Sequence, residues 1–130
     1  QDVYTSETNE HLTDRLTEEA LSFVENNQSR PFFLYLAHFA PHLLLQAKPQ
    51  KLPYYYFKYN RLSNGRNDPQ YAALVEGMDD GIGLLMKKLR ELKLLENTII
   101  LFTSDNGGLS IRQFGSRPTD NTPLRDGKGY

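Results

Sequence analysis

Two polar residues, Asp105 and Asn106, directly follow an uncharged run of strand-forming residues and precede two glycines. The run, residues 98–103, suits a strand that is buried on both faces of a parallel sheet. In open α/β sheets, ligands bind at the carboxyl ends of such strands. Carboxylate and amide oxygens are ligands for Ca²⁺ or Mg²⁺, although Asp-Asn-Gly is also ordinary turn chemistry. The stretch therefore predicts either a divalent-metal site or a plain turn.

A second polar cluster contains His38 and His42, and it follows another apolar, aromatic-rich run at residues 31–37. Because both clusters follow expected strands, the topology would place them at the same edge of the sheet. A lone histidine usually has a structural role. For two histidines so close together at such an edge, a functional role and a structural role are equally good interpretations.

Two cations near the end of the chain, Arg125 and Lys128, lie beside a pair of glycines. Cationic side chains next to open backbone can hold an oxyanion. The alternative is a surface loop with ordinary charges. A P-loop is excluded, because its Gly-x-x-x-x-Gly-Lys-Ser/Thr spacing is absent.

The elements that must position these residues alternate between helix and strand. Apolar residues at helical spacing predict amphipathic helices over residues 12–27 and 69–95, with Thr13 and Asp68 as their N-caps. Helix, buried strand, helix and buried strand form the α/β pattern, in which helices cover a largely parallel sheet.

The second expected helix carries two further patterns. Gly77 and Gly81 lie on one helix face, where they would admit a close contact with a neighbouring element. Asp79 and Asp80 could be metal ligands, but a solvated or helix-terminus-pairing face is the favoured interpretation.

Residues 54–59 read Tyr-Tyr-Tyr-Phe-Lys-Tyr. Aromatic rings interleaved with bases can form a platform for nucleic acid or sugar. The favoured alternative is a lid or short helix that packs its rings on the body of the protein, because few basic residues accompany the rings.

The composition excludes several classes of function. The chain has 130 residues and a net charge of -1, from 15 basic and 16 acidic residues, so no global field points to nucleic acid or an anionic membrane. The absence of cysteine excludes a disulfide framework, a thiolate zinc site and a cysteine nucleophile within these residues. No apolar run approaches the ~20 residues of a membrane span. Since the chain lacks an initiator Met and a terminating element, we expect a segment of a larger protein.

Six pieces of the chain carry a resemblance when they are taken together: residues 12–20 (LTDRLTEEA), 31–42 (PFFLYLAHFAPH), 46–49 (QAKP), 71–80 (YAA…MDD), 97–107 (NTIILFTSDNG) and 123–129 (PLRDGKG). In this order they resemble the sulfatase family, and most closely its arylsulfatase branch. The resemblance covers nearly the whole chain. It implies an α/β fold: a fragment of an alkaline-phosphatase-like sandwich, with a mostly parallel sheet flanked by helices.

The resemblance also implies site residues. Asp105 and Asn106 match the family's distal pair of Ca²⁺ ligands, with Mg²⁺ as the alternative ion. Lys128 matches a lysine that contacts the sulfate group and stabilises the leaving oxygen. His42 matches a histidine that hydrogen-bonds sulfate near the reacting centre, and His38 matches a more distant neighbour. The implied activity is that of a sulfuric ester hydrolase, which releases sulfate from a sulfated small molecule or a sulfated glycan.

Departures from the family concern the rest of the active site. The family's nucleophile is a formylglycine made from Cys or Ser in a Cys/Ser-x-Pro-x-Arg motif, and no such motif occurs here. The family's early Asp-Asp metal pair is also missing, Asp126 replaces a usual glycine, and residues 43–45 replace a usual Thr-Pro. We therefore expect residues 1–130 to be the central part of a sulfatase catalytic domain, without its N-terminal nucleophile region and its C-terminal region, and to be inactive alone.

Two alternatives stay open. A phosphoryl or phosphonate hydrolase of the same fold would use transition metals and a histidine-rich ligand set, which three histidines do not supply. A catalytically inactive binding or scaffold module is compatible with the missing nucleophile. No nucleic-acid partner is expected. The residues do not assign a compartment or an oligomeric state, although the resemblance favours an extracytoplasmic location (periplasmic, secreted or lysosomal).

Overall fold

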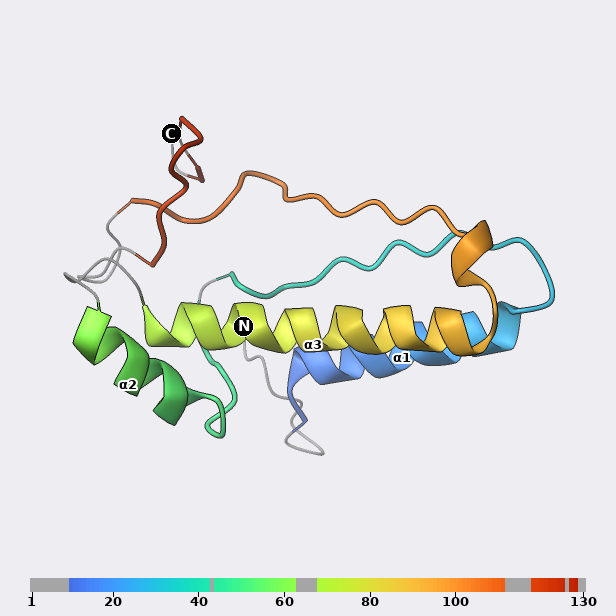
Figure 1. The fold of residues 1–130 in the computed structure, drawn as a ribbon, viewed down its shortest axis with the longest axis horizontal. Coiled ribbons are helices and arrows are strands. Elements are labelled where there is room, and N and C mark those ends of the chain that lie inside the picture. Colours follow the sequence, from blue (N-terminus) through green and yellow to red (C-terminus); the bar gives the residue numbers. More distant parts are fainter. Residues whose placement is uncertain (1–9, 43, 63–67, 112–117, 126, 129–130) are drawn as a thin grey trace. The chain divides into compact units, whose positions relative to one another are not determined.

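The structure, a computed structural model, describes residues 10–42, 44–62, 68–111, 118–125 and 127–128 (Figure 1). These residues form the helices α1 (Leu12–Asn27), α2 (Leu52–Leu62) and α3 (Pro69–Glu91), followed by the 3-10 turn η1 (Leu95–Asn97). Among them, no helix combines the length and the apolar character that crossing a membrane requires.

The chain divides into two compact units. The first unit consists of Gln1–Gln46 and Val75–Ile100, and the second of Ala47–Leu74 and Leu101–Tyr130. Helix α3 therefore contributes its first residues to the second unit and most of its length to the first. The candidate metal ligands and Lys128 belong to the second unit, whereas His38 and His42 belong to the first.

Helix α1 has the predicted bounds, but its predicted N-cap is wrong. The cap is His11, whose Nδ1 accepts a hydrogen bond from the Thr13 backbone N–H at 3.3 Å. The His11 Nε2 lies 2.9 Å from the Gln46 carbonyl oxygen. One neutral tautomer satisfies both contacts, because Nε2–H then donates while Nδ1 accepts. An imidazole can thus replace the usual hydroxyl or carboxylate cap, a substitution that the cap preferences did not predict.

Helices α1 and α3 pack closely at one glycine of the predicted pair. A Cβ added at Gly81 would overlap the Thr17 hydroxyl of α1, whereas one added at Gly77 would have no neighbour within 4 Å. The expected close contact is therefore confirmed at Gly81 and wrong at Gly77. The first unit buries apolar side chains on both helices, Ala20 and Val24 on α1 and Leu89 on α3.

The Gly81→Ala variant is expected to lower the free energy of unfolding by about 1–3 kcal/mol, as overpacking does. The new methyl group would displace Thr17, which is buried and donates from Oγ1 to the Thr13 carbonyl at 2.8 Å. Gly83→Ala is the matched control: nothing lies within 4 Å of its added Cβ, so the better helix propensity is expected to add about 0.5–1 kcal/mol. Urea unfolding of both variants checks this, and shifts of the same sign would contradict it.

Helix α3 begins at the predicted cap and ends before the predicted Leu95. The Asp68 carboxylate accepts from the backbone N–H of Gln70 at 2.7 Å and of Tyr71 at 3.2 Å. At the other end, Lys93 has φ 58, and the Leu94 N–H turns back to the Leu89 carbonyl at 2.8 Å. The left-handed residue satisfies carbonyls of the last turn and stops the helix, which a run of good helix formers does not indicate.

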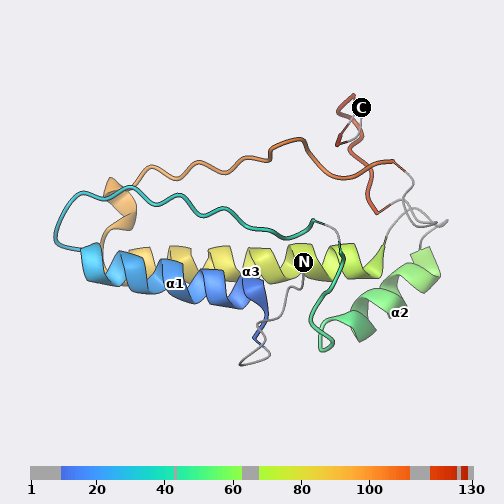
Figure 2. The same ribbon diagram turned by 180° about the vertical axis from the view of Figure 1, so that it is seen from behind.

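The two expected strands follow an extended path but form no hydrogen-bonded ladder within the described residues. In residues 31–38 exposed and half-buried side chains alternate, and Phe32 packs edge-on against Phe23 of α1 at 5.8 Å. The opposite face is open: Phe33 is 86% exposed, and Ile99 in the other stretch is 90% exposed. The predicted burial on both faces is therefore not found among the described residues. Such burial requires neighbouring strands and a second covering layer, whereas the described residues supply helices on one side (Figure 2).

Candidate functional site

The candidate metal ligands lie on a tight loop of the second unit, residues 104–108, which we call the ligand loop. The Ser104 hydroxyl accepts from the Gly107 N–H at 2.9 Å, and Gly107 has φ 73, a conformation that glycine adopts without strain. The Asn106 Nδ2 donates to the Asp105 Oδ2 at 2.5 Å. This bond is the main cause that lowers the pKa of the fully exposed Asp105 carboxyl, and the positive charge of Lys128 acts in the same direction.

Lys128 is held beside the ligand loop by its backbone. Its N–H donates to the Gly108 carbonyl at 3.2 Å, and it forms an isolated parallel bridge with Leu109. Two segments far apart in the sequence thus meet, and a carboxylate and an ammonium share one loop cluster. Arg125, the other cation of the predicted pair, is exposed, and Asp126 and Gly129 lie outside the described residues.

Sequence reasoning missed a third participant, Asn121. Its carboxamide makes two hydrogen bonds to one residue: Oδ1 accepts from the Gly108 N–H at 3.1 Å, and Nδ2 donates to the Gly108 carbonyl at 2.8 Å. An asparagine in a polar loop has no spacing pattern that could have singled it out. Its role depends on a contact between segments that are distant in the sequence.

The histidine cluster lies in the first unit. His42 is exposed. Its backbone N–H donates to the Phe39 carbonyl at 2.9 Å, and the centre of its ring lies 5.3 Å from the centre of the Phe39 ring. His38 differs, because both ring nitrogens are buried and have no hydrogen-bond partner among the described residues. Burial lowers the pKa of His38, since desolvation disfavours the imidazolium.

The chain is expected to become less stable as the pH falls through 6.5 and below, and His38 should cause part of that loss. The folded-state pKa of His38 is lowered from 6.5. As the pH falls through 6.5, the unfolded chain therefore binds a proton that the folded chain does not, and the free energy of unfolding decreases as the pH falls. His38→Phe should flatten this slope and remove a buried polar group without partners. His42→Phe, at an exposed position, is the control. Urea unfolding at several pH values checks this, and an unchanged slope in His38→Phe would contradict it.

The donor atoms of the ligand loop suit a hard cation but form an incomplete set. Asp105 offers a carboxylate and Asn106 a carbonyl oxygen, whereas Ca²⁺ takes six to eight oxygen ligands. Among the described residues, no group of three or more His, Cys, Asp or Glu side chains could hold a metal ion. Asp79 and Asp80 are both exposed on α3, as the favoured interpretation predicted. Asp105 and Asn106 therefore fit two positions of a larger ligand set.

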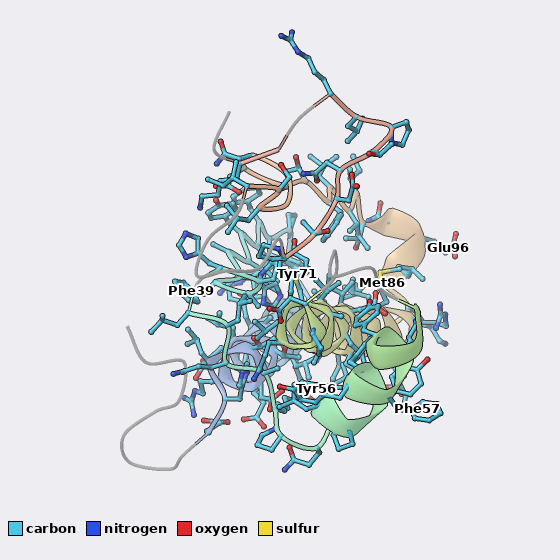
Figure 3. The ribbon with its side chains drawn as sticks, turned by 90° about the vertical axis from the view of Figure 1, so that its left-hand side faces the viewer. Phe39, Tyr56, Phe57, Tyr71, Met86 and Glu96 are labelled. Carbon is cyan, nitrogen blue, oxygen red and sulfur yellow. The ribbon has the colours of Figure 1, made fainter. Side chains whose placement is uncertain are left out.

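The aromatic stretch lies within α2. Of the two favoured alternatives, a lid or a short helix, the structure has the helix, but several of its rings are exposed rather than packed. Tyr54, Tyr56 and Phe57 are 60%, 52% and 61% exposed, and the last two project from α2 in different directions (Figure 3). The Lys58 ammonium lies 5.6 Å from the centre of the Tyr54 ring, a cation–π contact within one helix. The Lys58 ammonium thus contacts a ring of its own helix. Nothing in the described residues indicates a catalytic or binding role for α2.

A sequence model of one protein family and several known proteins are similar to this chain. The sequence model of the family described as Sulfatase matches residues 1–130. "Uncharacterized sulfatase YdeN" of Escherichia coli (strain K12) is 37% identical over 101 residues, and "N-acetylgalactosamine-6-sulfatase" of Mus musculus is 37% identical over 103 residues. These matches cover 76% and 78% of this chain, and 17% and 18% of the relatives.

Among solved structures, the fold is similar to that of Ps i-CgsB in complex with k-i-k-neocarrahexaose. The TM-score is 0.74 at 39% sequence identity, and the match covers 93% of this chain and 25% of that structure. The chain therefore has the α/β fold of this structure, in the part of an alkaline-phosphatase-like sandwich that it spans. It spans less than a fifth of the two curated relatives and a quarter of the solved structure.

Proposed function

Because the chain belongs to the sulfatase family, we propose that it is the central part of a catalytic domain that hydrolyses sulfate esters. The reaction adds water to the ester: the bond between sulfur and the ester oxygen breaks, the alcohol leaves with a proton, and sulfate is released. The nucleophile, a formylglycine, would come from a part of the protein outside residues 1–130. The substrate class is a sulfated small molecule or a sulfated glycan, and the name "N-acetylgalactosamine-6-sulfatase" of one relative refers to a sulfated sugar.

One observation supports this proposal most. The backbone N–H of Lys128 is hydrogen-bonded to the Gly108 carbonyl of the ligand loop, and the positive charge of Lys128 helps to lower the pKa of the Asp105 carboxyl. A sulfuryl group carries negative charge, and more develops on the leaving oxygen as the ester bond breaks. A lysine beside a carboxylate that holds Ca²⁺ would give this negative charge two positive neighbours, the ammonium and the ion.

Each residue then has a defined task. Asp105 and Asn106 would supply two oxygen ligands to Ca²⁺, which when bound would neutralise charge on the sulfate oxygens. Lys128 would donate a hydrogen bond to the sulfate group and stabilise the leaving oxygen. His42, whose ring is exposed, would hydrogen-bond the sulfate group, and His38 would support it from a more distant position.

The experiment that tests the proposal extends the chain by its flanking coding sequence. We expect a Cys/Ser-x-Pro-x-Arg motif upstream, and we expect the extended protein to release the phenol from a chromogenic aryl sulfate. Residues 1–130 alone should show no hydrolysis and bind Ca²⁺ weakly, because two ligands cannot complete a calcium site. An upstream sequence without the motif, together with an extended protein that is inactive, would instead favour a binding module.

A further inference from the structure

We propose that Asn121 is a positioning residue that holds the backbone of Lys128 at the ligand loop. The inference deepens the proposed function and rests on it, because the roles of Lys128 and Asp105 come from there. Asn121 itself need not touch substrate or metal. Its task is to make one arrangement of two loop segments much more stable than the others.

Asn121 pairs with the backbone of Gly108. The carboxamide both accepts from the Gly108 N–H (3.1 Å) and donates to the Gly108 carbonyl (2.8 Å), so it satisfies both polar groups of that residue. Of side chains this short, only a carboxamide offers a donor and an acceptor in this geometry, whereas aspartate lacks the donor. The backbone carbonyl of Asn121 also accepts from the Leu124 N–H at 2.8 Å, which anchors the residue to its own loop.

Gly108 also binds the backbone of Lys128. Its carbonyl oxygen accepts from Nδ2 of Asn121 and from the Lys128 N–H, which lies at 3.2 Å. A carbonyl has two lone pairs, and here both are directed to partners from the later segment. Gly108 also ends the ligand loop that carries Asp105 and Asn106. One residue, Gly108, thus joins the carboxamide, the lysine backbone and the loop of the candidate metal ligands.

The two segments also approach closely at two glycines, Gly108 and Gly127. A Cβ at Gly127 would overlap both Asn121 Nδ2 and the Gly108 carbonyl oxygen, and one at Gly108 would overlap the Thr119 methyl group. The close approach therefore requires glycine at both positions. The two hydrogen bonds of the Asn121 carboxamide thus form where the two segments approach closely, and they define the register in which the segments meet.

Positioning matters because a lysine side chain is long and flexible. Its backbone position decides where the ammonium group can reach, and a displacement of about 1 Å at a reacting centre can lower the rate about 10²-fold. A tether on the Lys128 backbone would therefore act on the rate of hydrolysis through Lys128.

The first test measures amide hydrogen exchange by NMR in the 130-residue chain. In Asn121→Ala, we expect the protection of the Gly108 and Lys128 amides to fall by about tenfold or more, while the interior amides of α3 keep theirs. Asp120→Ala is the matched control, because Asp120 accepts from the Thr122 N–H (2.9 Å) and hydroxyl (2.5 Å) on the same loop. Unchanged protection at Lys128 in Asn121→Ala, or an equal loss throughout α3, would overturn the inference.

The second test is a double-mutant cycle in the protein extended by its flanking sequence. Asn121→Ala is expected to lower kcat for an aryl sulfate by about tenfold or more with little change in KM, and to have almost no further effect when Lys128 is already alanine. Multiplicative effects of the two changes would overturn the positioning role alone. Full activity of Lys128→Ala would instead contradict the proposed function, so the two failures are distinguishable.

Discussion

Lys128→Ala is expected to lower kcat for aryl sulfate hydrolysis by about 10²–10³-fold in the protein extended by its flanking sequence, the range measured when one donor to a developing oxyanion is removed. The Lys128 ammonium would be the group of this chain that meets the leaving oxygen. Its backbone is held at Gly108 (3.2 Å), so the truncation removes the charge and leaves the anchoring hydrogen bond in place. The effect should therefore appear in kcat while the folded structure is retained.

Arg125→Ala is the matched control for Lys128. Arg125 is the other cation of the predicted pair, and it is exposed in the same loop. If general positive charge is sufficient, the two variants should lose similar activity. If Lys128 acts as proposed, Arg125→Ala should stay within about threefold of the parent. Steady-state kinetics and a thermal melt of both variants decide between these outcomes, and full activity of Lys128→Ala would reject the site assignment.

Asp105→Ala is the second change with a large expected effect. The carboxylate is fully exposed and already favours the ionised form, mainly through the Asn106 hydrogen bond. It is therefore available as an oxygen ligand over the neutral pH range. Its removal is expected to lower hydrolysis by the extended protein at least about 100-fold and to weaken calcium binding, because a metal site that loses its carboxylate loses both charge and a ligand.

Asp79→Ala serves as the control for Asp105, since Asp79 is an exposed carboxylate on the surface of α3. Its activity and calcium affinity should stay within about twofold of the parent. Calcium titration by calorimetry and chelation followed by re-addition of Ca²⁺ provide the measurements. Hydrolysis by Asp105→Ala that responds to Ca²⁺ like the parent would contradict the assignment of this ligand.

Local patterns in the sequence predicted α1 and most of α3 well. Apolar spacing predicted α1 from Leu12 to Asn27, and an aspartate before an N1 proline predicted the start of α3. These signals are local, since helix periodicity and end caps depend on residues a few positions apart. The errors arose where a distant or unusual group intervened. His11 replaced the expected cap Thr13, and a left-handed Lys93 ended α3 before Leu95.

The extended segments show a different limit. Residues 31–37 and 98–103 have the composition of buried strands and follow an extended path, yet Phe33 and Ile99 remain exposed among the described residues. The apolar composition of a segment indicates that it would be stable as a buried strand. Hydrogen-bonded pairing and burial require other segments, and those are not a property of the strand itself.

The sequence by itself determined the bounds of α1, the start of α3 and the α/β class, and it indicated the candidates Asp105, Asn106, Lys128, His38 and His42, because residue type and local spacing carry that information. Only the tertiary structure decided that Lys128 meets the ligand loop at Gly108 and that Asn121 holds both segments together. The physical reason is that a hydrogen bond between distant segments has no period in the sequence. It forms where the folded backbone brings one donor and one acceptor within about 3 Å.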